Sequence, residues 1–240
     1  MTDELLLGRM PFQAGPDSFP LSTDTMVLGD FVRLPKNARV VDLGSGSGAL
    51  GLLLCGRYPD CTVTGLELHR PSHEAALRNI ARNRLSERME SRLGDLRQVR
   101  SLLPPGSCHC VVSNPPYFSA GASSRSPAGP QARKEQACTL EDVFSAAAWL
   151  LRFGGSLYLV HRPERLVDLL SLGRAQGLEP KELQTVCHRP GHAPSLVLLR
   201  CRRGAKPGLA MLPELTLYGP DGAPTPAFRR IYHMDEGGLS

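Results

Sequence analysis

The feature that most constrains the fold of this chain is a glycine-rich segment between two apolar runs. Residues 38–43 (Ala-Arg-Val-Val-Asp-Leu) are typical of a short buried strand, and residues 49–54 (Ala-Leu-Gly-Leu-Leu-Leu) of the start of a helix. Between them stands the run Gly44-Ser45-Gly46-Ser47-Gly48. Because glycine lets the backbone turn tightly and approach a ligand closely, the three parts together predict a nucleotide-binding βα unit.

Strands and helices are predicted to alternate over the rest of the chain. Apolar runs predict strands over residues 63–68, 89–93, 110–113, 156–160, 183–187 and 195–201. Apolar spacing and capping residues predict helices over residues 25–32, 71–84, 139–153 and 161–176. Residues 190–194 predict a hairpin, which makes the last strand antiparallel. We therefore expect an α/β fold, with a Rossmann-like, seven-stranded, mostly parallel sheet, an antiparallel last strand and helices on both faces.

Polar side chains stand where several of these strands end. Glu67 ends the strand after the glycine run and lies 19 positions beyond Gly48, where an acid can hold ribose hydroxyls. Asp95 and Asn114 follow the next two strands. Ligands bind at the carboxyl ends of the strands in such sheets, so these side chains are expected to share one cleft.

The run Asn114-Pro115-Pro116-Tyr117 is an unusual way to end a buried strand. The two prolines cannot donate to a strand ladder, and each keeps the residue before it out of the helical region. The Asn114 side chain and the Pro115 carbonyl can therefore be held side by side, with the Tyr117 ring beyond them. Two hydrogen-bond acceptors and an aromatic face suit a planar group that carries an NH2, such as adenine, cytosine or a carboxamide.

Two ligands compete for the glycine run. The residues Gly46-Ser47-Gly48-Ala49-Leu50-Gly51 also fit the dinucleotide pattern, with Glu67 about 20 residues on. Asp42 favours a different ligand, because an acid at this position attracts the ammonium of an amino-acid moiety and repels a pyrophosphate. Taken with Glu67, Asp95 and Asn114 to Tyr117, the segment from Asp42 to Gly48 resembles the class I S-adenosylmethionine methyltransferases.

Three further segments resemble one family within that class. Ser22-Thr23-Asp24 before the glycine run, residues 159–166 (Leu-Val-His-Arg-Pro-Glu-Arg-Leu) and the tail from Pro207 to Ile231 are similar to the tRNA1(Val) (adenine-37-N6)-methyltransferases. The resemblance extends from about residue 18 over nearly the whole chain. Relatives often show Arg-His-Glu where this chain has Arg133-Lys134-Glu135. No helical domain precedes the core, which argues against the release-factor glutamine methyltransferases that share Asn-Pro-Pro-Tyr.

The resemblance implies a class I methyltransferase fold and assigns roles to residues. It implies that S-adenosyl-L-methionine is bound by Asp42, Gly44, Ser45, Gly46, Gly48, Glu67, Leu68, Asp95, Leu96 and Asn114. It implies a catalytic centre of Asn114, Pro115, Pro116 and Tyr117, which transfers the methyl group directly to N6 of an adenosine in tRNA without a metal. Methylation of an rRNA base or of a protein glutamine, and a cofactor-binding RNA module without catalysis, are the alternatives.

Composition and charge fit this expectation without demanding it. The formal net charge is +5, which permits an anionic partner, and basic residues cluster at 125–134 and 200–206. His161, Arg162 and the basic tail are also expected to meet RNA. Seven scattered cysteines indicate reduced thiols in a cytoplasmic protein, and no apolar run is long enough to span a membrane. We expect an N-terminal arm or lid (1–20), a methyltransferase domain (21–203) and a C-terminal extension packed on it (204–240); the oligomeric state is open.

Overall fold

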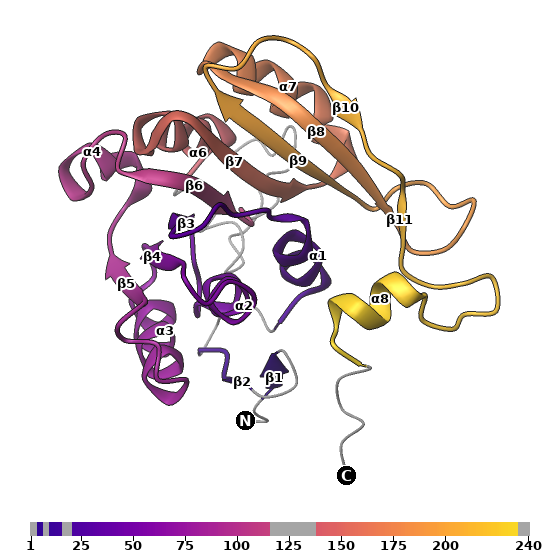
Figure 1. Ribbon diagram of the computed structural model, residues 1–240, viewed down its shortest axis with the longest axis horizontal. Helices are drawn as coiled ribbons and strands as arrows, with labels where there is room; N and C mark the ends of the chain where they lie inside the picture. The colour runs from indigo at the N-terminus through magenta and orange to yellow at the C-terminus, as the bar shows by residue number, and fades with distance from the viewer. Residues whose placement is uncertain (1–3, 7–9, 16–20, 116–137, 235–240) are drawn as a thin grey trace, which may run out of the picture.

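One mixed sheet forms the centre of the protein. The computed structural model describes residues 4–6, 10–15, 21–115 and 138–234. Within them, nine strands form a sheet in the order β10-β8-β9-β7-β6-β3-β4-β5, and β11 also pairs with β8 (Figure 1). The strands are β3 (Arg39–Leu43), β4 (Thr62–Glu67), β5 (Met89–Leu93), β6 (Cys108–Ser113), β7 (Leu151–His161), β8 (Leu178–Cys187), β9 (Leu196–Arg203), β10 (Ala210–Met211) and β11 (Leu215–Thr216). Only β9 runs against its neighbours in this described sheet, so the predicted parallel sheet with an antiparallel last strand is confirmed.

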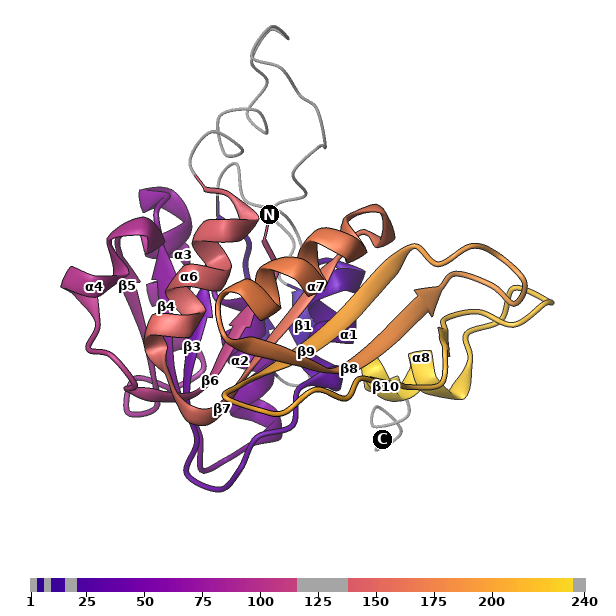
Figure 2. The ribbon, with the colours of Figure 1, turned by 90° about the horizontal axis from the view of Figure 1, so that it is seen from above.

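Helices cover both faces of the sheet, as predicted. The helices on one face are α1 (Thr23–Phe31), α2 (Ala49–Arg57), α3 (Arg70–Arg82) and α8 (Pro226–Ile231) (Figure 1). Those on the other face are α4 (Val99–Leu102), α6 (Leu140–Leu150) and α7 (Leu166–Ala175) (Figure 2). Each face has its own cluster of buried apolar side chains, so both sides of the strands are covered, as a parallel sheet requires.

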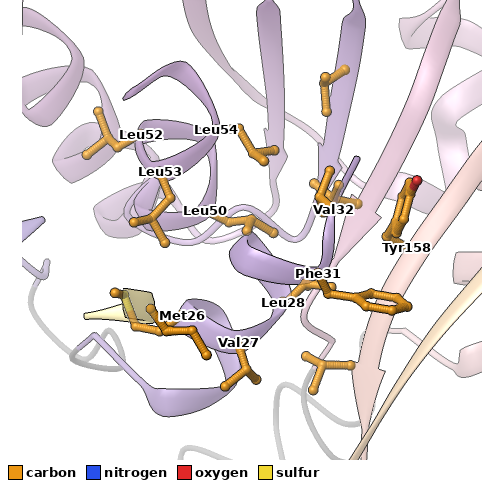
Figure 3. Close-up of a cluster of buried hydrophobic side chains, with 14 of the residues drawn as sticks. Met26, Val27, Leu28, Phe31, Val32, Leu50, Leu52, Leu53, Leu54 and Tyr158 are labelled. Carbon is orange, nitrogen blue, oxygen red and sulfur yellow. The ribbon is translucent and has the colours of Figure 1, made fainter. Parts of the chain in front are cut away.

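Helix α1 is set by a cap and an apolar face. Ser22 is its N-cap, and the Ser22 hydroxyl accepts a hydrogen bond from the Thr25 amide. Val27, Leu28 and Phe31 are buried against α2 and the sheet (Figure 3). The Phe31 ring meets the Tyr158 ring edge-on, with ring centres 5.7 Å apart. Burying a side chain of this size contributes about 1.5–3 kcal/mol, so α1 is firmly attached to the domain.

Strand β7 begins earlier than predicted. The sequence predicts that the helix from residue 139 reaches Gly154, but α6 ends at Leu150 and β7 follows at once. Gly154 has φ +76°, and the register of β7 against β6 shifts nearby. A Cβ on Gly155 would lie 2.9 Å from the His109 carbonyl oxygen. The two glycines therefore allow β7 to bulge close to β6 instead of ending a helix.

Strand β7 also extends further than predicted at its carboxyl end. His161 is the last residue of β7, where the sequence predicts the first residue of a helix. A 3₁₀ turn, Pro163–Arg165, comes next and leads into α7. Because Pro163 cannot donate a backbone hydrogen bond, it ends the strand and suits a first helical position.

The two ends of the described chain pack on the same body. A small antiparallel sheet pairs β1 (Glu4–Leu6) with β2 (Met10–Phe12). At the other end, β10 and β11 continue the sheet beside β8. Phe228 and Ile231 of α8 are buried in the cluster that also holds α1. The three-part division of the chain at residues 20 and 203 stays a prediction.

Candidate active site

The glycine run forms a loop at the carboxyl ends of β3 and β4. The amides of Gly44 and Ser45 donate to the Leu66 carbonyl oxygen at 2.9 and 3.2 Å. Gly44, Gly46 and Gly48 have φ values of +72°, +56° and +86°, a region in which other residues are strained. The backbone therefore needs glycine at these three positions.

The glycines border two different surroundings. A Cβ added to Gly44 or Gly46 would meet no atom within 4 Å, so open space lies beside both residues. A Cβ on Gly48 would lie 3.2 Å from Met89 Cε and 3.4 Å from Ala76 Cβ. Gly44 and Gly46 thus leave room for a ligand at the loop, and Gly48 lets the start of α2 pack closely against Ala76 of α3 and Met89 of β5.

Glu67 holds the loop through its carboxylate. Its Oε2 accepts a hydrogen bond from the Gly46 amide at 2.7 Å, and its Oε1 accepts one from the His69 amide at 2.7 Å. Each carboxylate oxygen has further lone pairs and can accept another donor, such as a ribose hydroxyl. Glu67 therefore shapes the loop at Gly46, the residue whose open side leaves room for a ligand.

Asp42 lies beneath the loop and is 2% exposed. Among the described residues its Oδ2 has no hydrogen-bond partner, and neither does the buried Ser45 hydroxyl. Burial and, to a smaller extent, the nearby charge of Glu67 together raise the pKa of Asp42 to about 7. Buried polar atoms normally have partners, so these atoms fit a bound group with donors, and an ammonium suits Asp42 best.

The strand after β4 contributes a third acid. Asp95 follows β5, and both of its oxygens accept from the Arg97 guanidinium; Oδ1 also accepts from the Arg97 amide at 2.9 Å. These hydrogen bonds lower the pKa of Asp95 and keep it ionised. Leu68 is exposed and Leu96 is half-buried, so both can contact a ligand at these strand ends.

Asn114 follows β6, the neighbour of β3 on the side away from β4. The Ser113 hydroxyl donates to the Leu43 carbonyl oxygen at 2.8 Å and ties the two strand ends together. Asn114 Nδ2 donates to the Thr25 hydroxyl of α1 at 3.1 Å. Pro115 is buried, and the remaining predicted residues, Pro116 and Tyr117, lie outside the described residues. The structure thus brings Asn114 beside the glycine loop, as the sequence predicts. It also brings Thr25 into contact with Asn114, a contact that the sequence does not predict.

The N-terminal segment supports the loop from behind. The fully buried Asn79 of α3 donates from Nδ2 to the carbonyl oxygens of Ser47 and Gln13 at 2.9 and 3.0 Å. Its Oδ1 accepts from the Gln13 amide, and the Gly15 amide donates to the Ser47 hydroxyl at 3.1 Å. Residues 10–15 are therefore attached to the domain. Sequence reasoning missed this contact, because nothing in the local pattern around Asn79 indicates a partner 66 residues away.

Two residues expected to meet RNA are not available to it. His161 is fully buried, and burial lowers its pKa to about 4, so this expectation was wrong. Arg200 forms an ion pair with Glu182 at 2.7 Å, and its guanidinium lies over the Tyr158 ring. Arg200 is therefore a structural residue of the sheet, and the basic segment at residues 125–134 lies outside the described residues.

Two hollows lie away from these strand ends. One, of about 490 Å³, lies among the C-terminal ends of α1, α2 and α8, and Asp30 in it pairs with both Arg57 and Arg230 at 3.0 Å. The other, of about 290 Å³, has four basic residues and no acidic residue in its lining, and we call it the basic groove. Its lining comprises Phe153, Gly154, Lys181, Arg202, Arg203, Gly204, Ala205, Lys206 and Pro207.

Comparison of the sequence with known proteins shows the family to which the chain is related. The sequence model of the family described as "Methyltransferase small domain" matches residues 23–170. The chain is 33% identical over 188 residues to the tRNA1(Val) (adenine(37)-N6)-methyltransferase of Aeromonas hydrophila, with 77% of each chain covered. The corresponding protein of Cronobacter sakazakii is 30% identical over 210 residues, with 87% of this chain and 84% of that protein covered.

The chain belongs to the tRNA1(Val) (adenine(37)-N6)-methyltransferase family. Its fold agrees: a crystal structure of a predicted O-methyltransferase from Agrobacterium tumefaciens superposes with a TM-score of 0.73 at 24% identity, covering 88% of this chain and 96% of that one. The fold of the family is thus the class I methyltransferase fold, whose cofactor is S-adenosyl-L-methionine. The loop fits this group, since Asp42 offers a carboxylate and Gly44 and Gly46 leave space.

Three further features of the described residues concern metals, membranes and thiols. No group of three or more metal-ligating side chains occurs among them. No described helix is long and apolar enough to cross a membrane. All seven cysteines are free thiols, and all except Cys138 are buried.

Proposed function

We propose that this protein transfers a methyl group from S-adenosyl-L-methionine to the exocyclic N6 of an adenosine in tRNA, at position 37 of valine tRNA as in its named relatives. One observation carries the proposal. Asn114 and the glycine loop stand at the ends of the paired strands β6 and β3, and Ser113 joins those ends by a hydrogen bond of 2.8 Å. An amine acceptor held by Asn114 is therefore beside a ligand held by the loop.

The residues around the loop have separate tasks in holding the cofactor, which supplies an electrophilic methyl group. Asp42 pairs with the ammonium of the amino-acid moiety, and Glu67 accepts from ribose hydroxyls. Asp95 accepts from the amino edge of the cofactor's adenine, and Leu68 and Leu96 give that ring an apolar surface. The open side of Gly44 and Gly46 lets the backbone approach the bound group.

The chemistry asked of Asn114 is to activate a weak nucleophile. The N6 lone pair of adenine is delocalised into the ring, so the amine is a poor nucleophile in its planar form. Asn114 Oδ1 and the Pro115 carbonyl oxygen accept hydrogen bonds from the two N–H groups of this amine. These bonds favour a geometry at N6 that is closer to tetrahedral. The lone pair would then be aligned toward the methyl group, and positioning of this kind lowers the barrier. Formation of the N6–CH3 bond would break the S–CH3 bond and release S-adenosylhomocysteine, and one N6 proton would pass to solvent. Tyr117, outside the described residues, is assigned to stack on the base.

The basic groove is proposed as an RNA contact remote from the reacting base. Phe153 is 80% exposed, and a Cβ on Gly204 would collide with its ring, so the ring packs closely against that glycine. An exposed ring of this kind can stack on a base, and the surrounding cations suit phosphates. Phe153 and Leu159 lie six residues apart on β7, and Leu159 pairs with Ser113 beside Asn114, a separation of roughly 20 Å along the strand. A tRNA spans this distance, whereas a free nucleoside does not.

The proposed location is the cytoplasm, where tRNA is modified and where seven free thiols stay reduced.

The decisive experiment is methylation by the purified protein, followed by mass spectrometry of nucleosides. Unmodified tRNA with S-adenosylmethionine should yield N6-methyladenosine, while free adenosine should react poorly because it lacks the remote contacts. Methylation of rRNA or of a peptide glutamine, with none in tRNA, would refute the proposed acceptor. Calorimetry that shows binding of NADH and none of S-adenosylhomocysteine would refute the cofactor.

A charge reversal tests the groove separately from the chemistry. Lys206→Glu should raise KM for tRNA about threefold or more, with kcat unchanged. The slope of log affinity for tRNA against log salt concentration should become shallower by about 1, the value for one phosphate contact. Lys36→Glu, an exposed lysine in the loop between α1 and β3, is the matched control. Equal effects of the two substitutions would mean that only net charge matters, and that the groove has no specific role.

A further inference from the structure

The Asn114 side chain is held by a residue far away in the sequence. Thr25 lies 89 residues before Asn114, and its hydroxyl oxygen accepts the hydrogen bond from Asn114 Nδ2 at 3.1 Å. Thr25 is only 9% exposed, so water has little access to compete for this contact. The hydrogen bond therefore joins the first turn of α1 to the residue that we assign to the reacting amine.

Thr25 is itself fixed on more than one side. Its amide donates to the Ser22 hydroxyl at 3.3 Å, and the two hydroxyl oxygens are 3.2 Å apart. At the start of the same helix, the Thr23 hydroxyl accepts a hydrogen bond from the Tyr232 phenol at 3.0 Å. Helix α1 packs closely on α2, since a Cβ on Gly29 would lie 3.3 Å from Leu53. Thr25 thus stands on a closely packed helix that is hydrogen-bonded at its first turn, which fixes the position of its hydroxyl relative to Asn114.

A carboxamide must be held the right way round to act on an amine. Its oxygen and nitrogen ends are similar in shape but opposite in hydrogen bonding, because the oxygen accepts and the nitrogen donates. An adenine amine needs an acceptor. If the amide turned over, Nδ2 would face the amine, and two donors would oppose each other.

We infer that Thr25 is a positioning residue for the methyl transfer, which holds the Asn114 carboxamide with Oδ1 toward the acceptor amine. The inference rests on the proposed function of Asn114. When Thr25 donates its single hydroxyl hydrogen to the Ser22 oxygen, its own oxygen is left as an acceptor for Nδ2. Thr25 touches neither the substrate nor the cofactor in this role; it acts through Asn114 alone.

The test replaces the hydroxyl while keeping the shape. Thr25→Val should lower kcat by about 3- to 10-fold, the effect of one neutral hydrogen bond, and leave KM for tRNA and affinity for S-adenosylhomocysteine unchanged. Thr25→Ser keeps the hydroxyl and should restore most of the turnover. Thr23→Val is the matched control, because it removes a hydroxyl from the same helical turn that contacts Tyr232 instead of Asn114.

A double-mutant cycle shows whether the effect passes through Asn114. In an Asn114→Ala background, Thr25→Val should cause no further loss in single-turnover rate, because no carboxamide is left to orient. A full additional loss there, or wild-type turnover in Thr25→Val, would overturn the inference while the proposed function stands. A loss of turnover and Tm matched by Thr23→Val would reduce Thr25 to a structural role. Absence of N6-methyladenosine with the wild-type protein would instead overturn the proposed function, and the inference with it.

Discussion

The glycine loop and the Asn114 turn lie at neighbouring strand ends, yet they are held in place by different means. In the loop, backbone amides make the contacts: Gly44 bonds the Leu66 carbonyl, and Gly46 bonds the Glu67 carboxylate. At the Asn114 turn, side chains make them, through the Ser113 hydroxyl and through Thr25 on a separate helix. Both sides have partners that are distant in the sequence, since Asn79 and Gly15 also hold Ser47 of the loop. The difference is that backbone amides shape the cofactor side, whereas side chains hold the acceptor side. Substitutions in the two regions should therefore affect different steps.

The largest effect is expected on the acceptor side. Asn114→Ala should lower kcat by about 100-fold or more, or about 3 kcal/mol, because its contact with the amine strengthens in the transition state. Although the resemblance also counts Asn114 among the cofactor-binding residues, affinity for S-adenosylhomocysteine should barely change, because Asn114 Oδ1 is proposed to face the acceptor base. Single-turnover methylation of tRNA at saturating cofactor, with calorimetry beside it, measures both quantities.

Asn83→Ala is a suitable control for that experiment. Asn83, the C-cap of α3, also donates from its carboxamide, but to the carbonyl oxygens of Pro11 and Asn79, and its loss should leave kcat unchanged. Near-normal turnover in Asn114→Ala would mean that the turn is purely structural and would remove the contrast between the two regions.

An intermediate effect is expected on the cofactor side. Glu67→Ala should weaken cofactor binding by about 1–3 kcal/mol, the range for hydrogen bonds to a charged group. It should also lower Tm, because the amides of Gly46 and His69 lose their acceptor, while turnover at saturating cofactor stays near normal. Glu74→Ala, at an exposed position on α3, is the control. A fall in saturated turnover with unchanged affinity would contradict the division of tasks.

The smallest effect is a pH dependence due to Asp42. Because burial raises the pKa of Asp42 to about 7, only the ionised fraction can pair with the cofactor ammonium. Cofactor affinity should therefore rise about fivefold between pH 6 and pH 7, as the competent fraction grows. Without cofactor the sign is opposite: the raised pKa stabilises the fold at low pH, and that contribution is lost as pH rises through about 7.

Asp42→Asn should remove both trends, which isolates this carboxylate from the other groups that titrate in the same range. Calorimetry with S-adenosylhomocysteine and thermal unfolding across this pH range provide the two measurements. Persistence of the affinity trend in Asp42→Asn would assign it to another group and leave the cofactor side without its proposed ammonium partner.

Much of the site is determined by local sequence. The apolar run before Gly44, the glycines themselves and the helix after them can form only a strand, a tight turn and a helix, because φ values above zero suit glycine at this turn. The positions of Glu67, Asp95 and Asn114 at strand ends follow from the same local patterns. The alternation of strands and helices then brings these ends to one edge of a parallel sheet.

The tertiary structure decided what these residues touch. No pattern near Thr25 indicates a bond to Asn114, and the raised pKa of Asp42 comes from burial under a loop that forms only when β3, β4 and α2 assemble. Likewise the sequence by itself suggests an exposed histidine at 161 and a helix through Gly154, whereas pairing with β6 and β9 buries the first and extends β7 over the second. Periodicity reports the conformation of a segment, but burial, pKa and side-chain partners depend on residues that are distant in sequence and near only in the folded protein.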